Sequence, residues 1–342
     1  MREGILAKIG NTPLVRLSQV MKGIDFQLYA KLEGFNPGGS IKDRPAINVI
    51  EQGIKSGDIT PETVIIESSS GNMGIGLAQT CSYFGLKLIC VVDPKTTTQN
   101  IRLLEAYGTE VDRIVDPDPQ TGEFLKARID RVKMLCEVME NSFWPNQYSS
   151  MHNPAAHHRT MEEIMTALDG EVDYLFCTTS TCGTLRGCAE YIREHNLKTE
   201  IYAVDAIGSV IFGGEKAKRL IPGHGAAVCP PLFRDDLADR CVHVSDLDCV
   251  IGCRRLARQE AILAGGSSGG ALMAVQYSLK EIQAGANCVV ILPDRGERYL
   301  DTVYCDAWVR EHFGEVSHHW EQREALPVWQ QQVEEDSCLI TV

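Results

Sequence analysis

NPGGSIKDRP at residues 36–45 carries a lysine, Lys42, where a glycine-rich loop leads into a helical pattern. Pro45 has no amide hydrogen and is tolerated only in the first turn of a helix, so we expect Asp43 to be the N-cap. SSSGNMG at residues 68–74 forms a second polar loop, also followed by a helical pattern. Helix N-termini attract anions, so the two loops predict a cleft in which an amine lies beside an anion-binding loop.

Two further loops have the same chemistry and lie between an apolar run and a helical pattern. They are Ser180-Thr181-Cys182-Gly183-Thr184 and GGSSGG at residues 265–270. Such loops expose backbone N–H and hydroxyl groups, which are the donors that a phosphate ester requires. Together the loops predict a pocket for a phosphorylated cofactor. The glycines at 71, 74 and 76 are spaced G-x-x-G-x-G and no Walker lysine follows any loop, which disfavours a nucleotide site.

The composition argues against several classes of protein. The chain has 342 residues, 44% of them hydrophobic, enough for two compact domains or one large domain with an extra lobe. A net charge of -13 with scattered lysines and arginines disfavours a nucleic acid or an anionic membrane as the partner. The 13 cysteines include no CxxC pair, and Cys249 and Cys253 lack a second pair at zinc-site spacing, so no metal site is expected. Without a signal-peptide pattern or a run long enough to span a membrane, a reduced cytoplasmic protein is expected.

Short β-branched runs alternate with helical patterns through most of the chain. Six runs are predicted as buried strands: 27–32, 63–67, 86–92, 172–177, 201–204 and 288–292. Two helices are expected between them, 75–84 ending at Gly85 and 98–107 capped by Thr98. The alternation predicts an α/β fold of mostly parallel sheets flanked by helices, with ligand-binding loops at the carboxyl ends of the strands.

The alternation is interrupted from Ser142 to Pro154, as expected where a chain crosses between two lobes. The residues after Glu315 also lose the strand–helix rhythm, and are interpreted as a peripheral arm that contacts another subunit or as a mobile terminus. We therefore expect a smaller mobile lobe with Lys42, a larger lobe with the loop at 180–184, and the arm. The smaller lobe comprises residues 1–11 and 37–148, the larger lobe residues 12–36 and 149–315, and the arm residues 316–342.

Five motifs in one order resemble the cysteine synthase and cystathionine β-synthase family of fold-type II pyridoxal-phosphate enzymes. The resemblance covers roughly residues 1 to 310. The motifs are NPGGSIKDRPA (36–46), SSSGNMG (68–74), STCGTLRG (180–187), GGSSGG (265–270) and LPDRGERYLD (292–301). The resemblance implies a two-lobed fold like that of the tryptophan synthase β-subunit, pyridoxal 5'-phosphate as the cofactor, amino acids as substrates, and a homodimer.

The resemblance also implies a role for each cofactor-binding residue. Lys42 would form the Schiff base with the cofactor and move the α-proton of the substrate, which requires a primary amine. Asn72 would hydrogen-bond the 3-hydroxyl of the cofactor. Ser267 would face its pyridine nitrogen without enforcing protonation of the ring, which favours β-elimination over transamination. The cofactor phosphate would be held by Ser180, Thr181, Cys182, Gly183 and Thr184.

By the same resemblance, the substrate carboxylate would bind the loop residues Ser69, Ser70, Asn72 and Met73. Met73 departs from the threonine that is common in cysteine synthases. Asp294-Arg295 stands where those enzymes usually have small, uncharged residues, and the guanidinium of Arg295 would suit a second anionic group on a substrate. These departures resemble the N-(2-amino-2-carboxyethyl)-L-glutamate synthase branch, as do three further stretches: VVDPKTT (91–97), NQY (146–148) and AVDAIGSVIFGG (203–214).

That branch joins O-phospho-L-serine to L-glutamate and releases phosphate, a step toward 2,3-diaminopropionate for siderophores and related metabolites. Both substrates are strongly anionic, so extra cationic donors are expected in the cleft. Arg128 is the first candidate, Tyr148 could donate a hydroxyl, and Ser180 is a third predicted contact. The alternative for Arg128 is a solvated helix face, and for Tyr148 an ordinary packing aromatic. Two further side chains, His157 and His158, are expected on a helix surface.

Two other functions stay open at this point. One is a cysteine synthase that uses O-acetylserine or O-phosphoserine with sulfide, against which Met73 and Arg295 argue. The other is a catalytically silent family member that acts as a binding partner, against which the intact Lys42 and phosphate loop argue.

Overall fold

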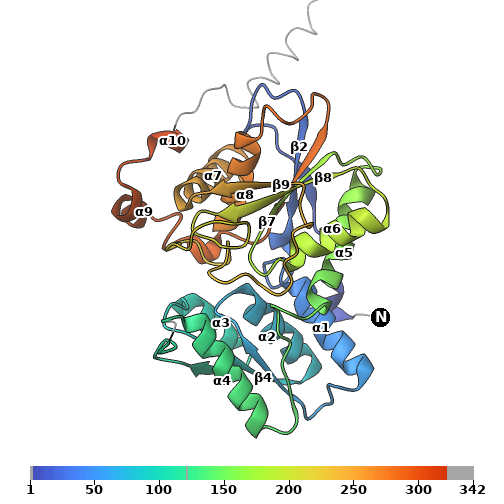
Figure 1. Ribbon diagram of the computed structural model, residues 1–342, viewed down its shortest axis with the longest axis vertical. Coiled ribbons are helices and arrows are strands. Elements are labelled where there is room, and N and C mark those ends of the chain that lie inside the picture. Colours follow the sequence, from blue (N-terminus) through green and yellow to red (C-terminus); the bar gives the residue numbers. More distant parts are fainter. Residues whose placement is uncertain (1–2, 121, 322–342) are drawn as a thin grey trace, which may run out of the picture.

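The computed structural model describes residues 3–120 and 122–321, which form two β-sheets with helices on both faces (Figure 1). The larger sheet has the strand order β1-β2-β10-β7-β8-β9, and only β1 pairs antiparallel with its neighbour. Its strands are β1 (Leu14–Arg16), β2 (Gln27–Leu32), β7 (Tyr174–Thr178), β8 (Glu200–Ala206), β9 (Arg240–Val244) and β10 (Asn287–Leu292). The predicted α/β fold of mostly parallel sheets is confirmed.

The smaller sheet has the order β5-β4-β3-β6 and is wholly parallel. Its strands are β3 (Val64–Ser68), β4 (Lys87–Val92), β5 (Glu110–Arg113) and β6 (Ser142–Phe143). The sequence predicted β3 and β4 but not the short strands β5 and β6, nor β1 and β9 of the larger sheet. These four carry few fully buried side chains, so the apolar runs that mark a strand buried on both faces are missing from them.

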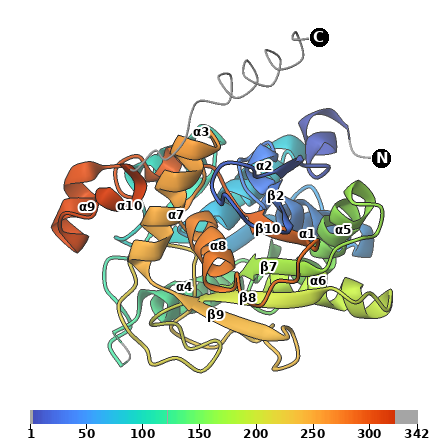
Figure 2. The same ribbon diagram turned by 90° about the horizontal axis from the view of Figure 1, so that it is seen from above.

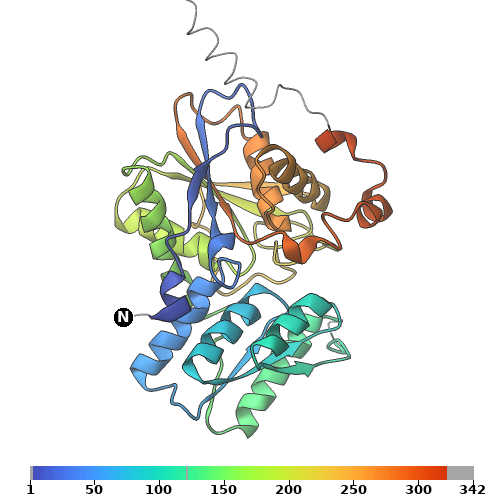
Figure 3. The same cartoon turned by 180° about the vertical axis from the view of Figure 1, so that it is seen from behind.

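Helices cover the two faces of the smaller sheet. On one face α1 (Asp43–Ser56), α2 (Asn72–Phe84) and α3 (Thr98–Ala106) enclose an apolar cluster around Ile65 and Cys90. On the other face α4 (Phe124–Val138) packs Val132 and Leu135 against β3 and β4. Seen from behind, the N-terminal 3-10 segment Gly4–Lys8 lies beside α1, where Leu6 and Ile9 contact Ile47 (Figure 3).

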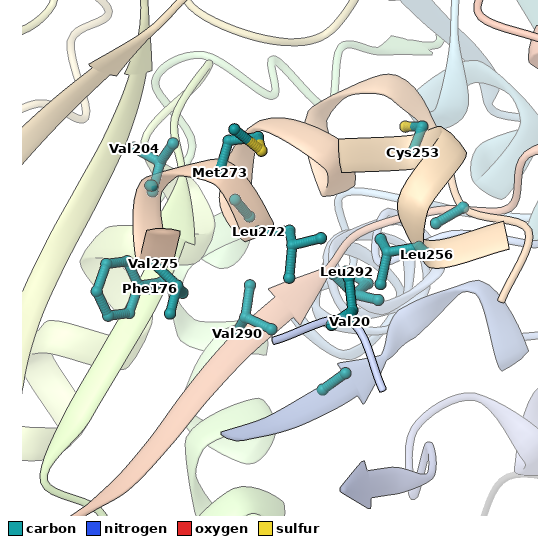
Figure 4. Close-up of a cluster of buried hydrophobic side chains, with 14 of the residues drawn as sticks. Val20, Phe176, Val204, Cys253, Leu256, Leu272, Met273, Val275, Val290 and Leu292 are labelled. Carbon is teal, nitrogen blue, oxygen red and sulfur yellow. The ribbon is translucent and has the colours of Figure 1, made fainter. Parts of the chain in front are cut away.

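The larger sheet also has helices on both faces. α5 (His152–Ala167) and α6 (Gly183–Glu194) cover one face, and α7 (Asp246–Gln259) and α8 (Gly266–Tyr277) cover the other. In the close-up of the second face, Leu272 and Val275 of α8 lie over Phe176 and Val290 (Figure 4). α8 is apolar all round because it is enclosed between the sheet and α7.

Near the end of the described chain, α9 (Asp306–Phe313) and α10 (His318–Glu321) lie beyond α7, away from α5 and α6 (Figure 2). Trp320 is buried, with the guanidinium of Arg254 5.1 Å from its ring centroid. The predicted arm therefore begins as a segment packed on α7, and its residues 322–342 lie outside the described part. Among the described helices, none combines the length and apolarity needed to cross a membrane.

Three predicted helix boundaries were wrong by a few residues. α1 has Lys42 as its N-cap, and Asp43 is already helical while its carboxylate accepts an N–H from Gly38. α2 begins at Asn72, three residues earlier than expected, because the polar loop itself forms the first turn. α3 is capped by Thr97, whose hydroxyl accepts from Asn100 N at 3.2 Å, and not by Thr98. The predicted end of α2 at Gly85 is confirmed, with φ at +70°.

Candidate active site

Lys42 is held at the start of α1 by a loop clamped to the segment after β10. Ile41 N donates to Pro293 O at 2.8 Å, and Arg295 N donates to Gly39 O at 3.2 Å. Gly39 has φ at +85°, a conformation that glycine adopts without strain. The ε-amino group lies near Asp294, Cys177 and Cys182, all on the larger sheet or its loops. The loop thus carries the lysine from the smaller part of the fold to the carboxyl ends of β7 and β10.

The amine of Lys42 has properties suited to a nucleophile. Burial lowers its pKa below the usual value, against the opposing influence of Cys177, Asp294 and Cys182. Within the described residues, Nζ has no hydrogen-bond or ion-pair partner. A lowered pKa makes the amine easier to deprotonate, and the deprotonated form can attack an aldehyde and take up a proton.

The loop at residues 180–184 ends in the N-terminus of α6. Cys182 is the N-cap with φ at +64°, and Gly183 N donates to Thr181 Oγ1 at 3.3 Å. A Cβ on Gly183 would collide with the side chain of Asn153, so only glycine fits there. The first N–H groups of a helix lack partners within the helix. The loop can therefore hold an anion such as a phosphate with backbone donors, as the sequence predicted.

His157 is buried beneath this loop, so its predicted place on a helix surface was wrong. Its Nε2 lies 3.3 Å from Thr184 Oγ1 and its Nδ1 lies 3.2 Å from Thr160 Oγ1. Burial, followed by the charges of Lys42 and Arg44, holds its pKa well below the usual value, so the ring is neutral. His158 is the partly exposed one, near Glu190 and Glu194. The spacing of His157 to Met161 and Ile164 was the signal that could have shown its burial, because these residues share the face of α5 that packs on α6.

The loop at residues 68–74 leads into α2, and the Ser69 side chain and the Ser70 backbone carbonyl stabilise the turn. Ser69 Oγ accepts from Gly74 N at 2.9 Å, and Ser70 O accepts from Asn100 Nδ2 at 3.0 Å. Met73 is buried in the apolar cluster between the smaller sheet and its helices. Its predicted contact with a carboxylate therefore rests on its backbone N–H, and the thioether does not replace a threonine hydroxyl beside the substrate.

Asn72, at the first position of α2, is held from both sides by residues that follow β10. Its Nδ2 donates to Asp294 Oδ2 at 2.8 Å, and its Oδ1 accepts from Arg298 Nη1. Tyr299 OH also donates to Asp294 Oδ2, at 2.7 Å. The sequence marked Asp294 as a departure from cysteine synthases but predicted no contact of Asp294 or Arg298 with Asn72, although both lie in the motif LPDRGERYLD.

Ser267 lies in the first turn of α8 and is buried. Next to it, the hydroxyl of Ser268 is buried without a hydrogen-bond partner in the described residues. Arg295 is largely exposed, and its Nε donates to Gly34 O at 2.6 Å. This contact holds the Arg295 guanidinium on a backbone carbonyl of the 3-10 segment Glu33–Phe35, which weakens its expected role as an anion-binding group.

Arg128 on α4 is buried, so the alternative of a solvated helix face is wrong. Its Nε lies 3.1 Å from Asp93 Oδ2, but the geometry is not that of a hydrogen bond, and Nε is left without a hydrogen-bond partner. Burial raises the pKa of Tyr148, and the nearby charge of Arg128 opposes that change. Arg128 and Tyr148 therefore lie near each other at the carboxyl edge of the smaller sheet, where Asp93 follows β4.

The pocket has the donors and the free acceptors that pyridoxal phosphate requires. Lys42 offers a nucleophilic amine, and the N-terminus of α6 offers phosphate donors. Two buried oxygens beside these groups lack a hydrogen-bond partner in the described residues: Asp294 Oδ1, whose carboxyl group lies near Lys42, and Asn153 Oδ1, which lies against Gly183. Buried polar atoms are normally paired, so a group of unpaired ones marks a place for a polar ligand.

Comparison with known proteins agrees with this geometry. Residues 5–294 match the family described as pyridoxal-phosphate dependent enzymes. The chain belongs to this family. This pyridoxal-phosphate-dependent enzyme is similar to a hydrogen sulfide-producing enzyme from Fusobacterium nucleatum. The two are 35% identical, with a TM-score of 0.81 over 88% of this chain and 100% of that one.

Two other solved structures are similar to this pyridoxal-phosphate-dependent enzyme. An O-acetylserine dependent cystathionine β-synthase from Helicobacter pylori is 32% identical, with a TM-score of 0.82 over 89% of this chain and 99% of that one. A cysteine synthase from Entamoeba histolytica is 34% identical, with a TM-score of 0.82 over 89% of this chain and 91% of that one. The expected fold, cofactor and enzyme class are thereby confirmed.

Proposed function

We propose that this enzyme replaces the phosphate of O-phospho-L-serine with the amino group of L-glutamate, forming N-(2-amino-2-carboxyethyl)-L-glutamate and inorganic phosphate. The bound cofactor supplies an electron sink for the negative charge that develops at the α-carbon. The ε-amino group of Lys42 takes the α-proton and later returns it. The N–H groups at the start of α2, with Ser69, Ser70, Asn72 and Met73, hold the substrate carboxylate.

The observation that carries this proposal is the buried, incompletely paired guanidinium of Arg128. A buried arginine whose Nε lacks a hydrogen bond can gain a charge-assisted contact when an anion arrives. Tyr148 lies nearby and could add a hydroxyl donor. A phosphate on one substrate and a second carboxylate on the other would each use such donors, whereas acetylserine and sulfide would not.

A second candidate function is that of a cysteine synthase acting on O-acetylserine or O-phosphoserine with sulfide. Two observations favour keeping it. Met73 points into the apolar core, so its difference from threonine no longer argues against sulfide chemistry. Arg295 is engaged with Gly34 O, so it adds little cationic character to the pocket.

The two candidates differ in the product they predict. Purified enzyme is incubated with O-phospho-L-serine or O-acetyl-L-serine and with L-glutamate, other amines, or sulfide, and the products are identified by mass. We expect N-(2-amino-2-carboxyethyl)-L-glutamate from phosphoserine and glutamate, with stoichiometric phosphate release. Cysteine formation with sulfide, with no product from glutamate, would contradict the proposal and select the cysteine synthase.

Arg128→Ala tests the cationic contact. We expect the variant to lose on the order of 2 kcal/mol of transition-state stabilisation, because one charge-assisted contact is removed. This loss would appear as a lower kcat/KM for phosphoserine or for glutamate. The matched control is Arg131→Ala on the same helix, which removes a more exposed guanidinium that pairs with Asp112 of β5. Equal kinetics for wild type and Arg128→Ala would remove Arg128 from the substrate site.

A further inference from the structure

The side-chain amide of Asn72, a predicted cofactor contact, lies between the carboxylate of Asp294 and the guanidinium of Arg298. A carboxylate accepts hydrogen bonds only, and a guanidinium donates only. Asp294 accepts from Nδ2 at 2.8 Å, and Arg298 donates to Oδ1. A carboxamide between such neighbours has a single favourable orientation, because a flip would place N–H against N–H and oxygen against oxygen.

Both flanking groups are themselves fixed. Asp294 is buried, and its Oδ2 also accepts from Tyr299 OH at 2.7 Å. A Cβ on Gly265 would collide with Asp294 Oδ1, so the carboxylate lies close against the N-terminal end of α8. Arg298 donates a second hydrogen bond, from Nη2 to Gly38 O in the loop that carries Lys42. The three groups therefore join the start of α2, the Lys42 loop and the segment after β10.

We propose that Asp294 and Arg298 are positioning residues that orient the side chain of Asn72, so that its second amide hydrogen points at the 3-oxygen of the cofactor. The inference rests on the predicted contact between Asn72 and the cofactor. It is independent of which amino acids are the substrates. An amide nitrogen carries two hydrogens, and Asp294 engages one of them, which leaves the other for the ligand.

A competing role for Asp294 is to act as the charge partner of Lys42, which lies near it. The two roles predict different behaviour in a double-mutant cycle. If Asp294 acts through Asn72, then D294N has no further effect once Asn72 has been replaced by alanine. If it acts through Lys42, then D294N has the same effect in both backgrounds.

The experiment measures pyridoxal phosphate binding to enzyme stripped of cofactor, and the visible absorption spectrum after reloading. We expect D294N to weaken binding about 10-fold to 100-fold, as for loss of a charge-assisted hydrogen bond, and to shift the absorption band in the same direction as N72A. In the N72A background, D294N should change affinity less than about twofold. The control Y299F removes the other donor to Oδ2 and should leave the band in place.

An additive loss in the double variant would overturn the inference, as would an unchanged spectrum and affinity in D294N. If D294N does not fold, the same cycle with R298M replaces it, since Arg298 holds the other end of the amide. Additivity of R298M with N72A would then overturn the inference. All of these readouts are independent of turnover, so they stand even if the enzyme proves to use sulfide in place of glutamate.

Discussion

Lys31 is buried and Lys42 is half-buried, and their amines have different hydrogen-bond partners. Burial lowers the pKa of each. Lys31 Nζ donates to Thr12 O and to Glu163 Oε2, both at 2.7 Å. Lys42 Nζ has no hydrogen-bond or ion-pair partner in the described residues. One buried amine is thus engaged in holding the fold together, while the other is left available for chemistry.

The surroundings of the two lysines differ in the same way. Around Lys31, Arg44 bonds Glu33 at 2.7 Å and Glu163 at 2.7 Å, so ionic groups from β2, α1 and α5 satisfy one another. Near Lys42, the buried Oδ1 of Asp294 lacks a partner in the described part of the chain, as does Asn153 Oδ1 at the phosphate loop. A paired network stabilises the native state, and a set of unpaired groups costs stability until a ligand binds.

The largest effect is expected from Lys42→Ala. Without the amine neither the cofactor linkage nor the proton transfer can form, so turnover should fall by at least about 10³-fold. Steady-state assays with the accepted substrate pair would measure this. Lys31→Met is the matched control, and it should keep the visible absorption of the cofactor despite lower stability. Normal turnover in Lys42→Ala would contradict the proposed difference between Lys31 and Lys42.

The next largest effect is expected from Arg44→Met. This change leaves Glu33 and Glu163 without their guanidinium partner, and breaking a buried ion pair in this way costs about 3–5 kcal/mol. Urea unfolding measures the loss. The control Arg234→Met removes an exposed partner of Asp236 and should cost far less, because solvent screens a surface ion pair. Similar losses for the two variants would show that the network is not a distinct stabilising unit.

A smaller effect on the free energy of unfolding is expected from pH, and it has opposite signs for Glu163 and Glu67. Hydrogen bonds and the charge of Arg44 outweigh burial and lower the pKa of Glu163 to about 2, so its stabilisation is present above pH 4.5 and is lost as pH falls toward 2. Burial raises the pKa of Glu67 to about 7, so its contribution is present below pH 4.5 and is lost as pH rises toward 7. For the buried Glu67 the shift corresponds to on the order of 3 kcal/mol, and solvent screening makes the contribution of the more exposed Glu163 smaller.

Unfolding free energies at a series of pH values check this prediction. Glu163→Gln should remove part of the loss on the acid side, and Glu67→Gln should flatten part of the fall between pH 4.5 and 7. Asp43, whose pKa is also raised to about 7 by burial, accounts for a further part of that fall. If Glu67→Gln steepened the fall instead, the assigned direction for Glu67 would be wrong.

Sequence patterns predicted the parts of this molecule that depend on local chemistry. Continuous apolar runs such as 27–32 and 288–292 become the central strands β2 and β10, and Gly85 ends α2 in a left-handed conformation. The Lys42 loop and the loop at 180–184 were found because glycine and hydroxyl residues stand directly before a helix. These signals lie within a few residues of each other, so spacing alone reveals them.

The sequence could not reveal contacts between distant residues. Asn72 and Asp294 are 222 positions apart, and only the folded chain brings them together. The burial of His157 depends on how α5 packs against α6. The pairing of Arg44 with Glu163 depends on the contact between α1 and α5. The burial of Arg128 follows from the packing of α4 on the smaller sheet, which its residue type alone does not show.

Chemical trapping of the cofactor tests the central comparison most directly. Pyridoxal phosphate is added to the stripped enzyme, the linkage is reduced with borohydride, and the labelled peptide is identified by mass spectrometry. We predict one label, on the peptide that contains Lys42. A label on Lys31, or on a surface lysine with Lys42 unmodified, would contradict the account.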